Sequence, residues 1–144
     1  MRTQEFTLDW QLPSRNKVDL ANRRNRYVGA KMKHDITGRI AIVIKSLMQS
    51  GQLRPIENPC IVSVLFTEPT RRQDVDNVGS AVKFLLDGMQ EAGLIQGDSP
   101  RYVIAVPTWV QYGEKPSVHT TIIEDCTDAL FSRVNEAQDV LRRE

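Results

Sequence analysis

The chain has 144 residues, enough for one domain with an ordinary hydrophobic core, so we expect residues 1–144 to form a single domain. Its 19 lysines and arginines nearly balance its 18 aspartates and glutamates, and the net charge of +1 identifies no class of partner. No apolar run approaches the roughly 20 residues that cross a bilayer, and no signal-peptide pattern is present, so we expect a cytoplasmic protein without a membrane partner.

The first half of the chain predicts a strand, a loop and a helix. Residues 4–12 alternate between apolar and polar side chains, as a half-buried strand does. Residues 13–27 are polar and basic without periodicity, which predicts a loop. From there to about Ser50 an apolar stripe predicts a helix, and Gly51 is placed to end it. The stripe consists of Met32, Ile36, Ile40, Val43, Ile44 and Leu47.

The second half completes an α+β domain. Residues 60–68 form a nearly continuous apolar run, which is typical of a strand buried on both faces. A second amphipathic helix follows, with Val78, Val82, Leu85, Leu86 and Met89 on its apolar face, and stops near Gly93. Residues 101–113 and 117–125 predict two strands joined by a turn, and Pro107 marks the first as an edge strand or a bulge.

A last helix is expected over about 127–142, capped by Asp125 or Thr127, with Leu141 among its buried residues. The predicted order is β-α-β-α-β-β-α, a single domain in which helices cover a mixed β-sheet. Cys60 and Cys126 show neither metal-ligand spacing nor a disulfide framework, so we expect small buried hydrophobic residues in a reducing compartment.

A run of basic residues interrupted by one acid, Asp19, spans residues 15–33. Such a run is more often a solvated face, but it is also a candidate surface for a polyanion. Its members are Arg15, Lys17, Arg23, Arg24, Arg26, Lys31 and Lys33.

The stretch TRRQDVDN, residues 70–77, places Asp74 and Asp76 directly after Arg71 and Arg72. The ordinary interpretation makes Asp76 the N-cap of the following helix and Asp74 a loop residue. If residues 74–76 are extended, however, the two carboxylates point the same way and repel each other unless a cation joins them. A hard divalent metal such as Mg²⁺ suits that arrangement, and the arginines could then hold a phosphodiester.

Two further features lie near this motif in the sequence. Asp76, Ser80, Lys83 and Asp87 recur at helical spacing, so Lys83 either forms an exposed ion pair with Asp87 or stands over the carboxylates at a scissile phosphate. Asp98 follows the helix in a Gly-Asp-Ser-Pro turn. It is either a turn residue or a third carboxylate returned to the pair.

Residues 74–99, DVDNVGSAVKFLLDGMQEAGLIQGDS, resemble the signature of the RusA family of Holliday junction resolvases, including its phage and prophage members. The shared pattern is Asp-x-Asp-Asn, a lysine, Leu-Asp-Gly/Ala, Ala-Gly and an acidic turn. Family members are small Mg²⁺-dependent endonucleases that act as homodimers and nick four-way DNA junctions symmetrically. The resemblance implies that Asp74, Asp76 and Asp98 bind Mg²⁺, for which Mn²⁺ could substitute, and that Lys83 assists at the phosphate. The chain departs from the family in having Gly97 where members often carry a second acid.

The resemblance covers about residues 1–124 and leaves the last helix outside the family core. It implies a homodimer that acts on four-way junctions in the cytoplasm of a bacterium or a phage-infected host. The basic run, with Arg71, Arg72 and Arg101, would contact phosphates without reading sequence. Tyr27 and Trp109 could stack on exposed bases, although packing is their commoner role.

Other activities fit the same residues. A nuclease for a broader range of branched DNA and a non-catalytic junction-binding accessory protein are the main alternatives. A small-molecule phosphohydrolase is the weakest, because no nucleotide-pocket motif is present.

Overall fold

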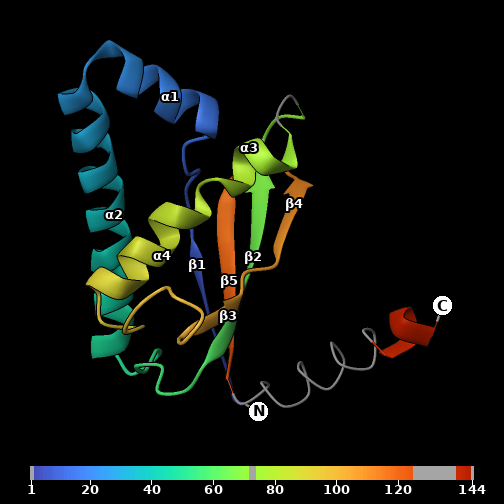
Figure 1. Ribbon diagram of the computed structural model, residues 1–144. Coiled ribbons are helices and arrows are strands. Elements are labelled where there is room, and N and C mark those ends of the chain that lie inside the picture. The colour runs from blue at the N-terminus through green and yellow to red at the C-terminus, as the bar shows by residue number, and fades with distance from the viewer. Residues whose placement is uncertain (1, 72–73, 125–138, 144) are drawn as a thin grey trace.

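The computed structural model describes residues 2–71, 74–124 and 139–143, and it confirms an α+β fold with a mixed sheet (Figure 1). The elements follow in the order β1 (Arg2–Leu8), α1 (Arg15–Arg24), α2 (Arg26–Gln49), β2 (Cys60–Glu68), α3 (Val75–Gly79), α4 (Val82–Glu91), β3 (Val103–Ala105), β4 (Thr108–Tyr112) and β5 (Ser117–Glu124).

The sheet has the order β1-β5-β2, and both β3 and β4 pair with the remaining side of β2. β5 is antiparallel to both of its neighbours, whereas β3 and β4 are parallel to β2. The predicted edge strand therefore exists, and it is interrupted at Pro107. The carbonyl of Pro107 accepts a hydrogen bond from Val64 N at 2.9 Å, so the interrupted edge stays attached to β2.

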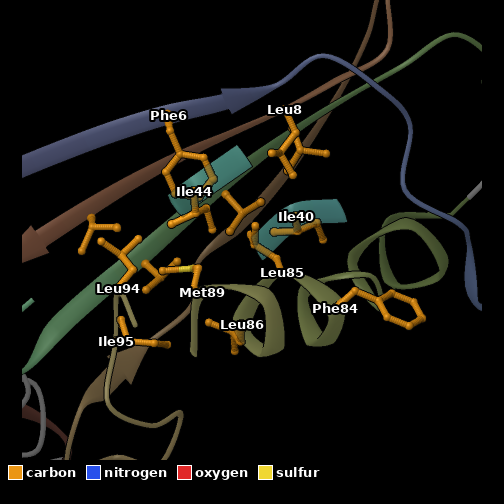
Figure 2. Close-up of a cluster of buried hydrophobic side chains, with 14 of the residues drawn as sticks. Phe6, Leu8, Ile40, Ile44, Phe84, Leu85, Leu86, Met89, Leu94 and Ile95 are labelled. Atoms are coloured by element: carbon orange, nitrogen blue, oxygen red, sulfur yellow. The ribbon is translucent and has the colours of Figure 1, made fainter. Parts of the chain in front are cut away.

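Helices α2 and α4 cover one face of the sheet and form the core with it (Figures 1 and 2). Alternate residues of β2, from Cys60 to Glu68, are buried on that face, while those between them are only half-buried. The prediction that β2 is buried on both faces was therefore wrong. The apolar core includes Phe6, Leu8, Ile40, Ile44, Leu85, Met89 and Leu94.

Glycines shape the ends and the contact of these helices. Gly51 and Gly93 both have φ of 82°, a left-handed conformation that glycine adopts without a steric penalty, and they follow α2 and α4 as predicted. Gly88 faces Ile40 of α2 so closely that an added Cβ would lie 2.5 Å from Cγ2 of Ile40. The absence of a side chain at Gly88 thus allows α4 to pack against α2.

The predicted loop over residues 13–27 was wrong, because a helix, α1, occupies most of it. Ser14 caps α1 by accepting a hydrogen bond from Lys17 N at 3.3 Å. Asn25 is extended, with φ of −175° and ψ of 137°, and its Oδ1 accepts from Tyr27 N at 2.7 Å to cap α2. Only Ala21 of α1 is buried, so the sequence of this helix has no apolar stripe from which it could be predicted. The first strand also ends earlier than predicted, at Leu8.

Most of the predicted C-terminal helix, including Asp125, Cys126 and Thr127, lies outside the described residues. Residues 139–143 are helical, and Leu141 is 70% exposed rather than buried. Cys60 is buried, as predicted. Within the described ranges, no helix combines the length and the apolar character needed to traverse a bilayer.

Candidate functional site

The acidic motif lies at the start of α3. Asp74 is the N-cap, with φ of −73° and ψ of 156°, and Asp76 is in the first turn of the helix. Both are exposed. The expectation that residues 74–76 are extended was wrong, because helical backbone begins at Val75. Side chains two positions apart on a helix point in different directions, so strand geometry does not bring these two carboxylates together.

The ordinary interpretation of Asp76 as the N-cap was wrong as well, since Asp74 holds that position and makes no side-chain capping bond. Asp76 instead pairs with Arg15, with 3.5 Å between Oδ2 and Nη1, and its side chain is 73% exposed. An ion pair so open to water contributes little stability. Asn77 Oδ1 accepts a hydrogen bond from Asn16 N at 3.1 Å. These contacts tie α3 to the beginning of α1.

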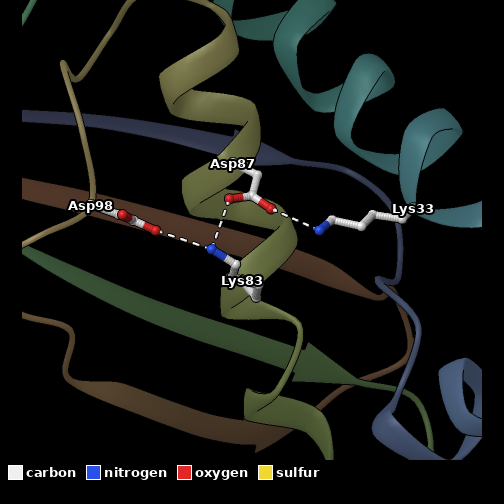
Figure 3. A network of polar contacts seen from close by, with 4 residues as sticks. All are labelled: Lys33, Lys83, Asp87 and Asp98. Atoms are coloured by element: carbon white, nitrogen blue, oxygen red, sulfur yellow. Dashed lines mark hydrogen bonds and ion pairs between the residues drawn. The ribbon is translucent and has the colours of Figure 1, made fainter. Parts of the chain in front are cut away.

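Lys83 is the centre of a second polar network (Figure 3). Its Nζ lies 3.1 Å from Asp98 Oδ2 and 3.1 Å from Asp87 Oδ1. The other oxygen of Asp87 lies 3.8 Å from Nζ of Lys33, on α2. The hydrogen bonds that Lys83 donates to Asp98 and then to Asp87, helped by the negative charge of both carboxylates, raise the pKa of Lys83. Lys83 therefore carries its positive charge at any physiological pH.

The predicted alignment of Asp76, Ser80, Lys83 and Asp87 on a single helix holds only in part. The helix is interrupted after Gly79, so Asp76 belongs to α3 and Lys83 and Asp87 belong to α4. The predicted exposed pair between Lys83 and Asp87 is present. The loop after α4 also returns Asp98 to this helix, where it meets Lys83.

The predicted metal ligands are not assembled in one place. Across residues 2–71, 74–124 and 139–143, no group of three histidine, cysteine, aspartate or glutamate residues is arranged to hold a metal ion. Asp74, Asp76 and Asp98 have the oxygen donors that Mg²⁺ prefers, but the carboxylate of Asp98 accepts a hydrogen bond from Lys83. The three carboxylates thus form no preassembled group among the described residues, and the metal assignment stays a prediction.

Part of the basic run converges beside this network. Arg15, Arg26 and Lys33 line a hollow of about 440 Å³ between α1, α2 and α4, and Lys83 lines its α4 side. Lys17 lines a separate hollow of about 360 Å³ that also contains Trp10 and Arg39.

The remaining predicted DNA contacts are scattered. The guanidinium carbon of Arg71 is 5.6 Å from the centre of the Tyr112 ring, and Arg101 lies at the same distance from Tyr102. Arg72 lies outside the described residues. Arg23, Arg24 and Lys31 are exposed on α1 and α2.

The two aromatic side chains proposed for stacking on bases are exposed to solvent. Tyr27 is 72% exposed and Trp109 is 58% exposed, so neither ring packs in the core. Trp109 Nε1 donates a hydrogen bond to Ser63 Oγ at 3.1 Å, so its ring is held on the sheet face that α2 and α4 leave open.

Helix α1, which the sequence did not predict, contributes one wall of this hollow. Arg15, Val18 and Asn22 recur at steps of three and four and therefore share one face of that helix. This spacing, together with Ser14 as a cap, was the signal available in the sequence. It was obscured because the face carries few apolar side chains.

Comparison of the chain with models of known protein families gives no match, and comparison with curated proteins gives none either.

Proposed function

We propose that this protein is a structure-specific endodeoxyribonuclease that resolves four-way DNA junctions by paired symmetric nicks. The observation that carries the proposal is the 3.1 Å contact between Lys83 Nζ and Asp98 Oδ2. It joins two residues of the RusA-like signature that are 15 positions apart. Such a contact is expected if the signature marks one site.

The residues of the chain have distinct roles in this proposal. Lys83 keeps its charge and would stabilise negative charge that develops at the scissile phosphate. Arg15, Arg26 and Lys33 would hold neighbouring phosphates, a sequence-independent interaction that weakens with salt. A homodimer with two-fold symmetry would set two such sites against two strands of a symmetric junction, so that paired nicks follow.

Mg²⁺, or Mn²⁺ in its place, belongs to the proposal through the resemblance, with Asp74, Asp76 and Asp98 as its ligands. A metal bound by Asp98 would have to share that carboxylate with Lys83 or displace it. When bound, the ion would neutralise phosphate charge and activate water. The roles given above to the basic residues do not depend on it.

A second candidate is a non-catalytic protein that binds junctions. One observation favours it: among the described residues, no group of three acidic, histidine or cysteine side chains is arranged to hold a metal ion. A nuclease for other branched DNA uses the same residues as the main proposal and differs in which branch shapes the dimer accepts.

The test uses a synthetic four-way junction, a fork and a linear duplex of the same sequence, each with Mg²⁺, Mn²⁺ or EDTA. We expect paired nicks in the junction with metal, no cleavage in EDTA, and loss of about a hundredfold or more in rate for Lys83→Gln. Asp76→Asn and Asp98→Asn should abolish cleavage, whereas the control Asp9→Asn, which changes an exposed acid directly after β1, should cleave normally.

Each outcome separates the candidates. Tight junction binding without cleavage in either metal would favour the accessory protein. Equal cleavage of the fork and the junction would favour the broader nuclease. Equal cleavage by wild type and Asp76→Asn would overturn the assignment of the site.

A further inference from the structure

The hollow between α1, α2 and α4, which we call the basic hollow, combines cationic walls with an apolar floor. Arg15, Arg26, Lys33 and Lys83 supply the cations, and none of its lining residues is acidic. Three carboxylates pair with these cations from outside the lining: Asp76 with Arg15, Asp98 with Lys83, and Asp87 with both Lys33 and Lys83. The electrostatic character of the hollow therefore suits an anionic occupant.

The three helices present matched faces to this space. α2 contributes Arg26, Gly29, Ala30 and Lys33, which recur at steps of three, one and three and so lie on one side of its first two turns. The N-terminal end of this 24-residue helix carries partial positive charge, and no acidic side chain lies in its first turn to offset it. Within the described residues, no carboxylate forms an ion pair with Arg26.

The floor is apolar and has a hydrogen-bonding amide at its edge. Val18, Ala30 and Phe84 line it, and Gly29 leaves room for the side chain of Asn22 to lie directly against α2. A carboxamide can both donate to and accept from the edge of a nucleobase. A volume of about 440 Å³ falls within the range of sites that enclose one small organic group.

We propose that the basic hollow binds one unpaired nucleotide of a DNA strand, with its phosphates on the cations and its base against the apolar floor. This inference rests on the proposed action on branched DNA and deepens it. At a branch point a base can leave its stack at low cost, and a site that accepts the freed base favours a branch over a continuous duplex. Lys83 belongs to both places, so a nucleotide held in the hollow would lie next to the candidate site.

The test measures binding without cleavage, in EDTA, by fluorescence anisotropy of a labelled eight-nucleotide thymidine strand and of a labelled duplex. Ala30→Trp fills the hollow without changing any charge, and Ala30 is exposed, so the fold has room for the substitution. Ile42→Trp is the matched control, because Ile42 is 69% exposed on the same helix but outside the hollow.

We expect Ala30→Trp to weaken binding of the single strand about tenfold, while its duplex affinity and both affinities of Ile42→Trp stay within about twofold of wild type. Gly29→Ala is a second variant with the same expected direction, because its new methyl group displaces the Asn22 amide. Gly29→Ala replaces Ala30→Trp in the test if circular dichroism shows that Ala30→Trp is unfolded. Equal single-strand binding by wild type, Ala30→Trp and Gly29→Ala would overturn the inference.

Two further outcomes are decisive. If free thymidine monophosphate competes at the same concentration as the strand, the occupant is a free nucleotide and the inference is wrong. If Ala30→Trp binds the single strand like wild type while wild type nicks junctions, the inference fails and the proposed function stands. If Ala30→Trp weakens single-strand binding but the wild type cleaves no DNA, the inference is supported and the proposed nuclease activity is wrong.

Discussion

Replacing Gly88 by alanine would place a methyl group between α4 and α2. The new Cβ would lie 2.5 Å from Cγ2 and 2.8 Å from Cβ of Ile40, and 3.3 Å from the carbonyl oxygen of Thr37. Carbon atoms pack best at about 3.5–4.0 Å, so the helices must separate by about 1 Å. Rotation of Ile40 offers little relief, because its Cβ does not move with χ1 and β-branched side chains in helices have one preferred rotamer.

The size of the effect follows from two opposing terms. Overpacking of this kind costs about 1–3 kcal/mol, whereas alanine gains up to about 1 kcal/mol over glycine within a helix. We therefore expect Gly88→Ala to lower the free energy of unfolding by about 1 kcal/mol. Gly38→Ala on α2 is the matched control: its Cβ would meet no atom within 4 Å, so it should raise the stability by up to about 1 kcal/mol.

Urea unfolding followed by circular dichroism measures both variants, and thermal midpoints should differ by roughly 4 °C for each kcal/mol. An Ile40→Ala background removes the nearer clashing atom, so Gly88→Ala should cost less there than in wild type, by about 1–2 kcal/mol of coupling. If Gly88→Ala stabilises the protein as much as Gly38→Ala does, or adds independently to Ile40→Ala, the packing of α4 on α2 described above is wrong.

Further predictions concern a buried acid and a helix cap. Glu68 is buried, and desolvation raises its pKa in the folded protein above the ordinary value of 4.5. The wild type therefore loses stability as the pH rises from 4.5, the pKa of the unfolded chain, through the higher pKa of the folded protein. Glu68→Gln should gain stability over wild type at pH 8 but not at pH 4, and exposed Glu114→Gln should show no such trend in urea titrations; an equal gain at both pH values would contradict this. Asn25→Ala removes the cap on Tyr27 N and should cost about 1 kcal/mol, whereas Asn25→Ser should restore most of it. A loss no larger for alanine than for serine would show that the cap does not hold α2.

The elements predicted best from the sequence are those whose signal is local. β2 begins and ends at the predicted residues, Cys60 and Glu68, because a β-branched apolar run needs no distant partner to be recognised. The ends of α2 and α4 were found because Gly51 and Gly93 adopt a conformation that few other residues tolerate. In contrast, α1 depends on a cap and on packing against α2, and its apolar signal is too weak to predict it.

The candidate site shows the same division. The i,i+4 pair of Lys83 and Asp87 could be predicted from helical spacing, and it is present. The contact of Lys83 with Asp98 depends on the path of the loop after α4, which spacing alone leaves open. The geometry of Asp74 and Asp76 was predicted wrongly, because a five-residue helix is too short to leave a periodic pattern in the sequence.

The position of β5 has a consequence for synthesis of the chain. β5 lies between β1 and β2, yet it follows every other described strand in sequence: Thr7 and His119, whose side chains are 2.8 Å apart across β1 and β5, are 112 residues apart. Until residues 117–124 leave the ribosome, β1 has no strand to pair with, and β2 exposes one edge to other chains. β2 ends at residue 68 and β5 ends 56 residues later, at residue 124, so at translation rates of roughly 5–20 residues per second this state lasts roughly 3–11 seconds. We therefore expect the nascent chain to be open to chaperones during this time, and the sheet to be completed only when β5 is available.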